Sequence, residues 1–112
     1  MLLVTFSKIG LDKDSRWDMV TETELFKVIQ ELIANIIKHA QARNVLIELI
    51  ADENMLYLTV EDDGIGFDLA DNTRHRFGLN NIEARLSILG GTVSFDSQTD
   101  RGTTVMINVP TA

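Results

Sequence analysis

The stretch that decides the fold is TETELFKVIQELIANIIKHAQ, residues 21–41. Its apolar residues recur at three- and four-residue spacing, which predicts an amphipathic helix of about five turns. These residues are Leu25, Val28, Ile29, Leu32, Ile33, Ile36, Ile37 and Ala40. Thr21 followed by Glu24 matches a capping box and predicts a helix start at Thr21 or Thr23. A helix with one apolar face needs a second layer to cover it.

Strand-like segments supply that layer. Residues 2–6 predict a short strand followed by a loop over 8–19, and residues 44–50 and 56–61 predict an antiparallel hairpin. Residues 92–96 and 103–109 predict a second hairpin, with its turn at 99–102. Between them lie an expected loop over 62–77 and a second helix from Leu79 to Leu89, ended by Gly90 and Gly91. This order predicts an α+β fold, a two-layer sandwich with a mostly antiparallel sheet covered by helices on one face.

Composition limits the function classes. The 112 residues predict one domain, residues 1–112, and the absence of cysteine excludes disulfide scaffolds and Cys-based zinc sites. A net charge of −7 repels phosphate backbones, so we expect no nucleic-acid partner. Because no apolar run approaches the ~20 residues of a membrane span, we expect no membrane contact.

One polar stripe lies beside the apolar face of the first helix. Lys27, Glu31, Asn35 and Lys38 follow one another at steps of four, four and three residues. A solvated helix face is the more common explanation for charged residues at this spacing. Asn35 argues against that reading, because Asn is a poor helix former and needs a partner for its amide. Its side-chain oxygen is also a ligand type that Mg²⁺ accepts.

Three further motifs contain glycine. Residues 62–67 read DDGIGF directly after a strand, which fits either a ligand-contacting turn or an ordinary turn. Gly78 opens the second helix, where backbone amides can face a phosphate or form a plain cap. Arg85 in that helix can support phosphates or pair with Glu83, and residues 101–104 fit a hairpin turn.

The order and spacing of these motifs resemble the GHKL superfamily, in particular the catalytic and ATP-binding domain of bacterial sensor histidine kinases. The similarity covers about residues 23–110. Residues 31–40 look like the N box, residues 62–66 like the first glycine box, and Gly78 with Leu79 like a shortened second one. The triplet at 38–40 resembles the subfamily whose kinases signal to helix-turn-helix response regulators. The resemblance implies the Bergerat ATP-binding fold, with ATP and Mg²⁺ as cofactors.

The resemblance also implies residue roles around the base of the nucleotide. Asp62 would bond the adenine amino group. Gly64, Ile65 and Gly66 would shape the adenine pocket, and Thr103 would form part of its wall.

At the phosphate end, the resemblance implies catalytic roles for Glu31, Asn35 and Lys38. Asn35 would ligate Mg²⁺, Lys38 would contact phosphate, and Glu31 matches a carboxylate proposed to act as general base. Further contacts near the phosphates are implied for His39, Gly78 and Leu79.

The implied reaction is transfer of the γ-phosphate to a histidine on a separate dimerisation domain, which then serves a response regulator. Neither His39 nor His75 lies in a phosphoacceptor context, and the helices that carry the acceptor are absent from the 112 residues. We therefore expect a cytoplasmic unit, from a parent that can be membrane-anchored, that binds Mg-ATP and ADP without phosphorylating itself. The alternatives are an anti-sigma-factor-type serine kinase and a nucleotide-binding scaffold without kinase activity. ATP-driven conformational machines of the same superfamily need a longer lid.

Overall fold

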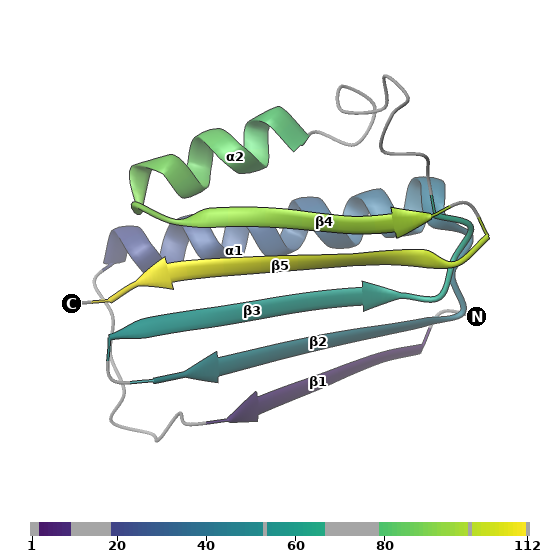
Figure 1. Ribbon diagram of the computed structural model, residues 1–112, viewed down its shortest axis with the longest axis horizontal. Helices are drawn as coiled ribbons and strands as arrows, with labels where there is room; N and C mark the ends of the chain where they lie inside the picture. Colours follow the sequence, from purple (N-terminus) through teal and green to yellow (C-terminus); the bar gives the residue numbers. More distant parts are fainter. Residues whose placement is uncertain (1–2, 10–18, 53, 67–78, 99, 112) are drawn as a thin grey trace.

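The computed structural model describes residues 3–9, 19–52, 54–66, 79–98 and 100–111. It has the predicted α+β architecture, with a five-stranded sheet in the order β1-β2-β3-β5-β4 (Figure 1). The strands are β1 Leu3–Ile9, β2 Asn44–Ala51, β3 Met55–Asp62, β4 Thr92–Gln98 and β5 Gly102–Pro110. The helical elements are α1 Met19–Asn35, the π-helical turn η1 Ile36–Ala40, and α2 Leu79–Ile88.

The sheet is mostly antiparallel, as predicted. Both expected hairpins are present, since β2 pairs antiparallel with β3, and β4 with β5. At the edge, β1 runs parallel to β2, so the chain must cross over between them, and α1 makes that crossover. The predicted strand over 2–6 was too short, because pairing with β2 extends β1 through Ile9.

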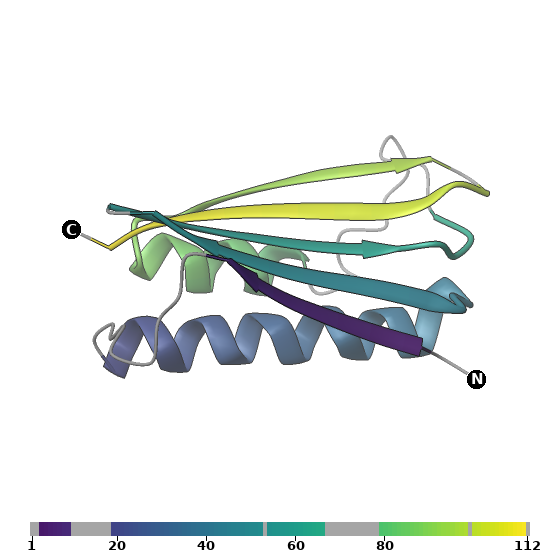
Figure 2. The same ribbon diagram turned by 90° about the horizontal axis from the view of Figure 1, so that it is seen from below.

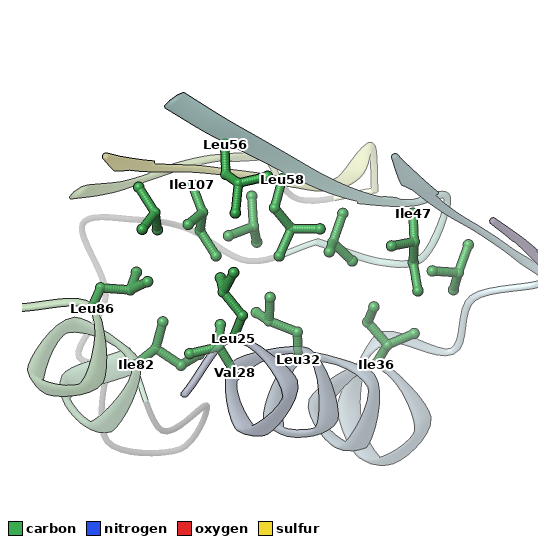
Figure 3. Close-up of a cluster of buried hydrophobic side chains, with 14 residues drawn as sticks. Leu25, Val28, Leu32, Ile36, Ile47, Leu56, Leu58, Ile82, Leu86 and Ile107 are labelled. Atoms are coloured by element: carbon green, nitrogen blue, oxygen red, sulfur yellow. The ribbon is translucent and has the colours of Figure 1, made fainter. Parts of the chain in front are cut away.

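Both helices cover the same face of the sheet (Figure 2). Their apolar sides meet alternate residues of the three central strands, β2, β3 and β5 (Figure 3). The buried core consists of Leu25, Val28, Leu32, Ile36, Val45, Ile47, Leu56, Leu58, Val60, Ile82, Leu86, Val105, Ile107 and Val109. The predicted two-layer sandwich with helices on one face is therefore confirmed.

The predicted capping box at Thr21 and Glu24 was wrong. The helix is already formed at Met19, so Thr21 lies inside it and is buried. The Glu24 carboxylate instead accepts a hydrogen bond from the Arg85 guanidinium of α2, with 3.1 Å between Nη1 and Oε2. This charge-assisted contact links the two helices and occupies the arginine for which phosphates or Glu83 were the expected partners.

The first helix changes geometry before it ends. The prediction was one continuous helix to Gln41, but the regular turns stop at Asn35 and η1 forms a wider π-helical turn. Gln41 then adopts a left-handed conformation with φ of 51°. Such turns occur often at functional sites.

The second helix ends as the glycine pair predicted. Gly90 takes a left-handed φ of 68°, and its N–H donates to the carbonyl of Ser87. The N–H of Gly91 donates to the carbonyl of Leu86 over 2.8 Å, which completes a Schellman motif. Within the described ranges, no helix combines the length and apolarity needed to cross a bilayer.

Candidate functional site

The candidate site is a pocket between the η1 end of the long helix and the adjoining part of the sheet. It is open to solvent, and the space within it, including its open mouth, is about 490 Å³. Its lining residues are Leu32, Asn35, Ile36, His39, Ala40, Val60, Asp62, Gly66, Phe95, Thr103 and Val105. Helix, sheet and the loop after β3 therefore all contribute.

Two rows of side chains lie on the face of the sheet at this pocket. Asp62 of β3 is in register with Thr103 of β5, which is in register with Ser97 of β4, and we call these three the polar row. One step along the strands lies an apolar row on the same face: Val60, Val105 and Phe95. Because side chains two residues apart on a strand share a face, both rows point toward the helices. A flat ligand can thus rest on apolar surface while its polar edge meets the polar row.

Asp62 is the buried charge of the site, with 7% of its surface exposed. Its Oδ1 accepts a hydrogen bond of 2.9 Å from the N–H of Gly64. Removal from water raises the pKa of this carboxyl, while the backbone N–H groups of Gly64 and Thr103 oppose the rise. A buried carboxylate with capacity left for a further donor is suited to hold a ligand's amino group.

Thr103 and Ser97 are joined by their hydroxyl groups. The two oxygens lie 2.8 Å apart, and Ser97 Oγ also lies 3.1 Å from the carbonyl oxygen of Gly102, to which it donates. Ser97 is buried behind Thr103 and does not line the pocket itself.

The glycines of the 62–66 loop allow backbone to approach backbone. A Cβ on Gly64 would overlap the carbonyl oxygen of Ala40, which accepts a 2.7 Å hydrogen bond from the N–H of Ile65. A Cβ on Gly66 would overlap the carbonyl oxygen of Gln98, and Gly66 also has a φ of 63°. Both glycines therefore allow the loop to lie against η1 and the β4–β5 turn, and Gly66 also lines the pocket.

Asp63 attaches the same loop to the residues at the start of β2. Its Oδ1 accepts hydrogen bonds of 2.9 Å from the N–H groups of Arg43 and Asn44, and its Oδ2 accepts one of 2.7 Å from Asn44 Nδ2. These bonds lower the pKa of Asp63, the side-chain bond from Asn44 most of all. The two neighbouring carboxylates thus have different roles and opposite pKa shifts: Asp62 faces the pocket, and Asp63 binds the start of β2.

On the helix side, Asn35 and His39 line the pocket and are half-buried. Glu31 is half-buried one turn before Asn35, and Lys38 is exposed on η1; neither is among the lining residues. Ile65 is 42% exposed and contributes backbone hydrogen bonds. Among further predicted residues, Leu79 is the first of α2, while Gly78 lies outside the described residues.

The described residues contain no group of three or more His, Asp or Glu side chains arranged for a metal. Mg²⁺ commonly takes one or two protein oxygens and completes its shell with phosphates and water. The Asn35 side-chain oxygen at the pocket wall therefore fits a metal that arrives together with a phosphate ligand.

Sequence reasoning missed Ser97 and Phe95. Both belong to a strand whose alternation was visible, but their relation to Asp62 depends on β5 lying between β3 and β4. No local pattern reveals that register.

Comparison with known proteins gives consistent matches. The family model described as "Histidine kinase-, DNA gyrase B-, and HSP90-like ATPase" matches residues 20–112. Sensor histidine kinase ComP of Bacillus subtilis is 39% identical over 76% of this chain and 11% of its own length. The signal transduction histidine-protein kinase/phosphatase DegS of the same organism is 32% identical over 96% of this chain and 29% of its own length. This chain spans less than a third of the length of either relative.

Solved structures share the fold. The blue-light activated histidine kinase of Erythrobacter litoralis EL346 superposes with a TM-score of 0.78 at 20% sequence identity. The match covers 98% of this chain and 35% of that protein.

Proposed function

Since this chain belongs to the histidine kinase-, DNA gyrase B-, and HSP90-like ATPase family, we propose that it is the ATP-binding and catalytic part of a sensor histidine kinase. The observation that carries the proposal is the buried Asp62 carboxylate at the edge of an apolar pocket floor. A purine base needs such a floor for its ring faces and an acceptor for its amino group.

The base lies on the apolar row, and its amino group donates to Asp62. Thr103 lines the pocket beside Asp62, in register with it across β3 and β5. The phosphates then extend toward Asn35 and His39 on the helix side. Lys38 and the start of α2, with Gly78 and Leu79, complete the phosphate contacts.

Phosphoryl transfer requires mainly positioning and neutralisation of charge. The Asn35 oxygen holds Mg²⁺, which when bound supplies that neutralisation at the phosphates. Glu31, one turn before Asn35, orients or polarises the attacking imidazole. That imidazole comes from a histidine on a dimerisation domain, and a response regulator receives the phosphoryl group afterwards.

The ligand is tested by isothermal titration calorimetry with ADP and ATP, in Mg²⁺ and in EDTA. We expect binding of both nucleotides, weaker in EDTA. Asn35→Ala should abolish the difference between Mg²⁺ and EDTA and leave the metal-free affinity within about twofold. The control is Asn81→Ala, at an exposed position on α2. If the chain binds neither nucleotide, the proposal fails.

The reaction is tested with ATP labelled at the γ-phosphate. The chain alone should acquire no label, whereas its fusion to a histidine-bearing dimerisation domain should acquire acid-labile label on that histidine. Acid-stable label on a serine of a partner protein would identify the serine-kinase alternative instead.

A further inference from the structure

The sheet has a second face, which none of the described helices or strands covers. Figure 2 shows both helices on one side of the strands. Because side chains alternate along a strand, the residues between the core positions of β2, β3, β4 and β5 point to the other side. We call this side the outer face. The proposed function assigns it no role.

One end of the outer face is apolar. Ile50 of β2 is in register with Tyr57 of β3. Met55 lies two residues before Tyr57 on the same face, and Met106 of β5 is a diagonal neighbour of Tyr57. We call these four residues the apolar patch. Tyr57 is 37% exposed and Met106 is 44% exposed, so the patch is open to solvent, as at a contact surface.

The other end of the outer face is acidic. Glu61 of β3 is in register with Thr104 of β5, and Thr104 is in register with Asp96 of β4. Glu48 of β2 is a diagonal neighbour of Glu61. The strands β2 to β5, all of which the structure describes, contain no Lys or Arg. The negative charge of this face is therefore not balanced by the strands that carry it.

This arrangement of charge decides between the possible occupants. A second copy of the chain would set carboxylates against carboxylates in one orientation, and against the apolar patch in the other. Nucleic acid and anionic lipid are repelled. An extended peptide cannot add to the middle of the sheet, because β2, β3 and β5 already have a neighbour on both sides. A helix that carries both apolar and basic side chains matches the face.

The dimensions suit one such helix. At ~4.8 Å per strand, the outer face measures ~14 Å from β2 to β4, and a helix with its side chains is ~10–12 Å wide. Along β3, the distance from Met55 to Glu61 is ~20 Å at ~3.4 Å per residue. A helix of about 14 residues covers that length and reaches both the apolar and the acidic end.

We propose that the outer face docks a partner protein through a basic amphipathic helix. The apolar side of that helix lies on the apolar patch, and its Lys or Arg side chains meet Glu48, Glu61 and Asp96. Complementary charge speeds the encounter of separate molecules, a benefit that a segment tethered to the same chain does not need. The charge therefore favours a separate protein as the source of the helix.

The probe for this surface is a fluorescent peptide of about 14 residues, with Leu on one side of the helix and Lys on the other. Its affinity is measured by anisotropy without nucleotide, in about 0.15 M salt, which screens distant charges. Glu61→Lys should weaken binding about three- to tenfold, because an exposed ion pair is replaced by a repulsion. Glu22→Lys, at an exposed position on α1, changes the net charge equally and should weaken binding less than twofold.

The apolar contact has its own matched pair of variants. Met106→Ser should weaken binding about fourfold, the value of roughly one buried methylene group. Phe26 is also exposed, but it lies on α1, so Phe26→Ser should leave the affinity unchanged.

Methionine methyl NMR shows where the peptide lies. Met55 and Met106 belong to the outer face, whereas Met19 is 81% exposed at the start of α1. A nitroxide on the peptide should broaden the methyl signals of Met55 and Met106 and leave that of Met19 sharp.

Several results would overturn the proposal. These are a peptide that does not bind, equal losses of affinity in Glu22→Lys and Glu61→Lys, and a Met19 signal that broadens as much as that of Met106. Equal binding of a peptide with Glu in place of Lys would also overturn it. So would a dimer in sedimentation equilibrium that Met106→Glu dissociates, because a second copy would then occupy the face. Since no measurement contains nucleotide, none of these results bears on the proposed ATP binding.

Discussion

Replacing Asp62 by Asn should separate ligand binding from stability. The substitution keeps the size of the side chain but exchanges one oxygen for a donor NH₂ group. Asp62 Oδ1 is already held by the N–H of Gly64 at 2.9 Å. An Asn that keeps this bond turns its NH₂ group toward the pocket, where it meets the donor amino group of the base. An Asn that turns the other way loses the bond to Gly64.

The orientation that keeps the bond to Gly64 removes the hydrogen bond between the base and a charged group, which is worth about 1.5–3 kcal/mol. The affinity for ADP should therefore fall roughly 10- to 150-fold. Stability should respond differently. Because burial raises the pKa of Asp62 above 3.8, the folded protein binds more protons than the unfolded chain between that value and the raised one. The contribution of Asp62 to stability thus decreases as pH rises through this window.

Asn does not titrate, so the Tm of Asp62→Asn minus that of the wild type should increase from about pH 4 to about pH 7. Calorimetric titration with ADP measures the affinity, and thermal melting without nucleotide measures the stability. Asp96→Asn, at an exposed position on β4, is the control and should change neither. The reasoning is refuted if Asp62→Asn binds ADP within about twofold of the wild type. It is also refuted if the Tm difference decreases with pH.

Three other experiments test how the structure around the site is held. Gly64→Ala places a Cβ against a carbonyl oxygen of η1, so it should lower the free energy of unfolding in urea by ~2–5 kcal/mol and weaken ADP binding. The control Gly90→Ala is strained by its positive φ but not crowded, and it should lower the free energy of unfolding by only ~1 kcal/mol. Asp63→Ala should lower the urea midpoint at neutral pH. Because the pKa of Asp63 is lowered from 3.8, this difference should vanish as pH falls through the lowered value; a constant difference would contradict the assignment. For Arg85 and Glu24, whose side chains are 39% and 15% exposed, a double-mutant cycle with Gln should give a coupling below ~1 kcal/mol.

Much of the fold follows from local patterns. Three- and four-residue spacing placed Leu25, Val28, Leu32 and Ile36 on one face, and the structure buries all four in the core. Ile37 belonged to the same predicted set but is 66% exposed, because a cluster of apolar residues covers a wider arc than the contact with the sheet. The glycine pair after α2 was equally readable, since a left-handed residue there is mainly a property of glycine.

Long-range geometry accounts for what local patterns missed. The parallel pairing of β1 depends on a crossover through α1, and neither strand's sequence records its partner. The capping box failed because the helix already extends to Met19, and Glu24 pairs with Arg85, 61 residues away. The π-helical turn also ends in a long-range contact, since the Ala40 carbonyl accepts a hydrogen bond from Ile65, on a loop after β3.

These long-range contacts hold the walls of the pocket together. The loop after β3 is held at η1 through Ile65 N–H, and at the β4–β5 turn through the 2.6 Å bond from Asp100 N–H to the Ile65 carbonyl. One residue thus ties helix and hairpin together across the pocket, and each attachment stands beside a glycine whose Cβ would prevent it. Where a chain's own contacts fix a pocket, less order has to be created on binding, so more of the contact energy is available as affinity. The chain carries a net charge of −7, so long-range electrostatics do not attract a phosphate ligand to it. Its affinity for such a ligand therefore depends on local contacts in a pocket that is already ordered.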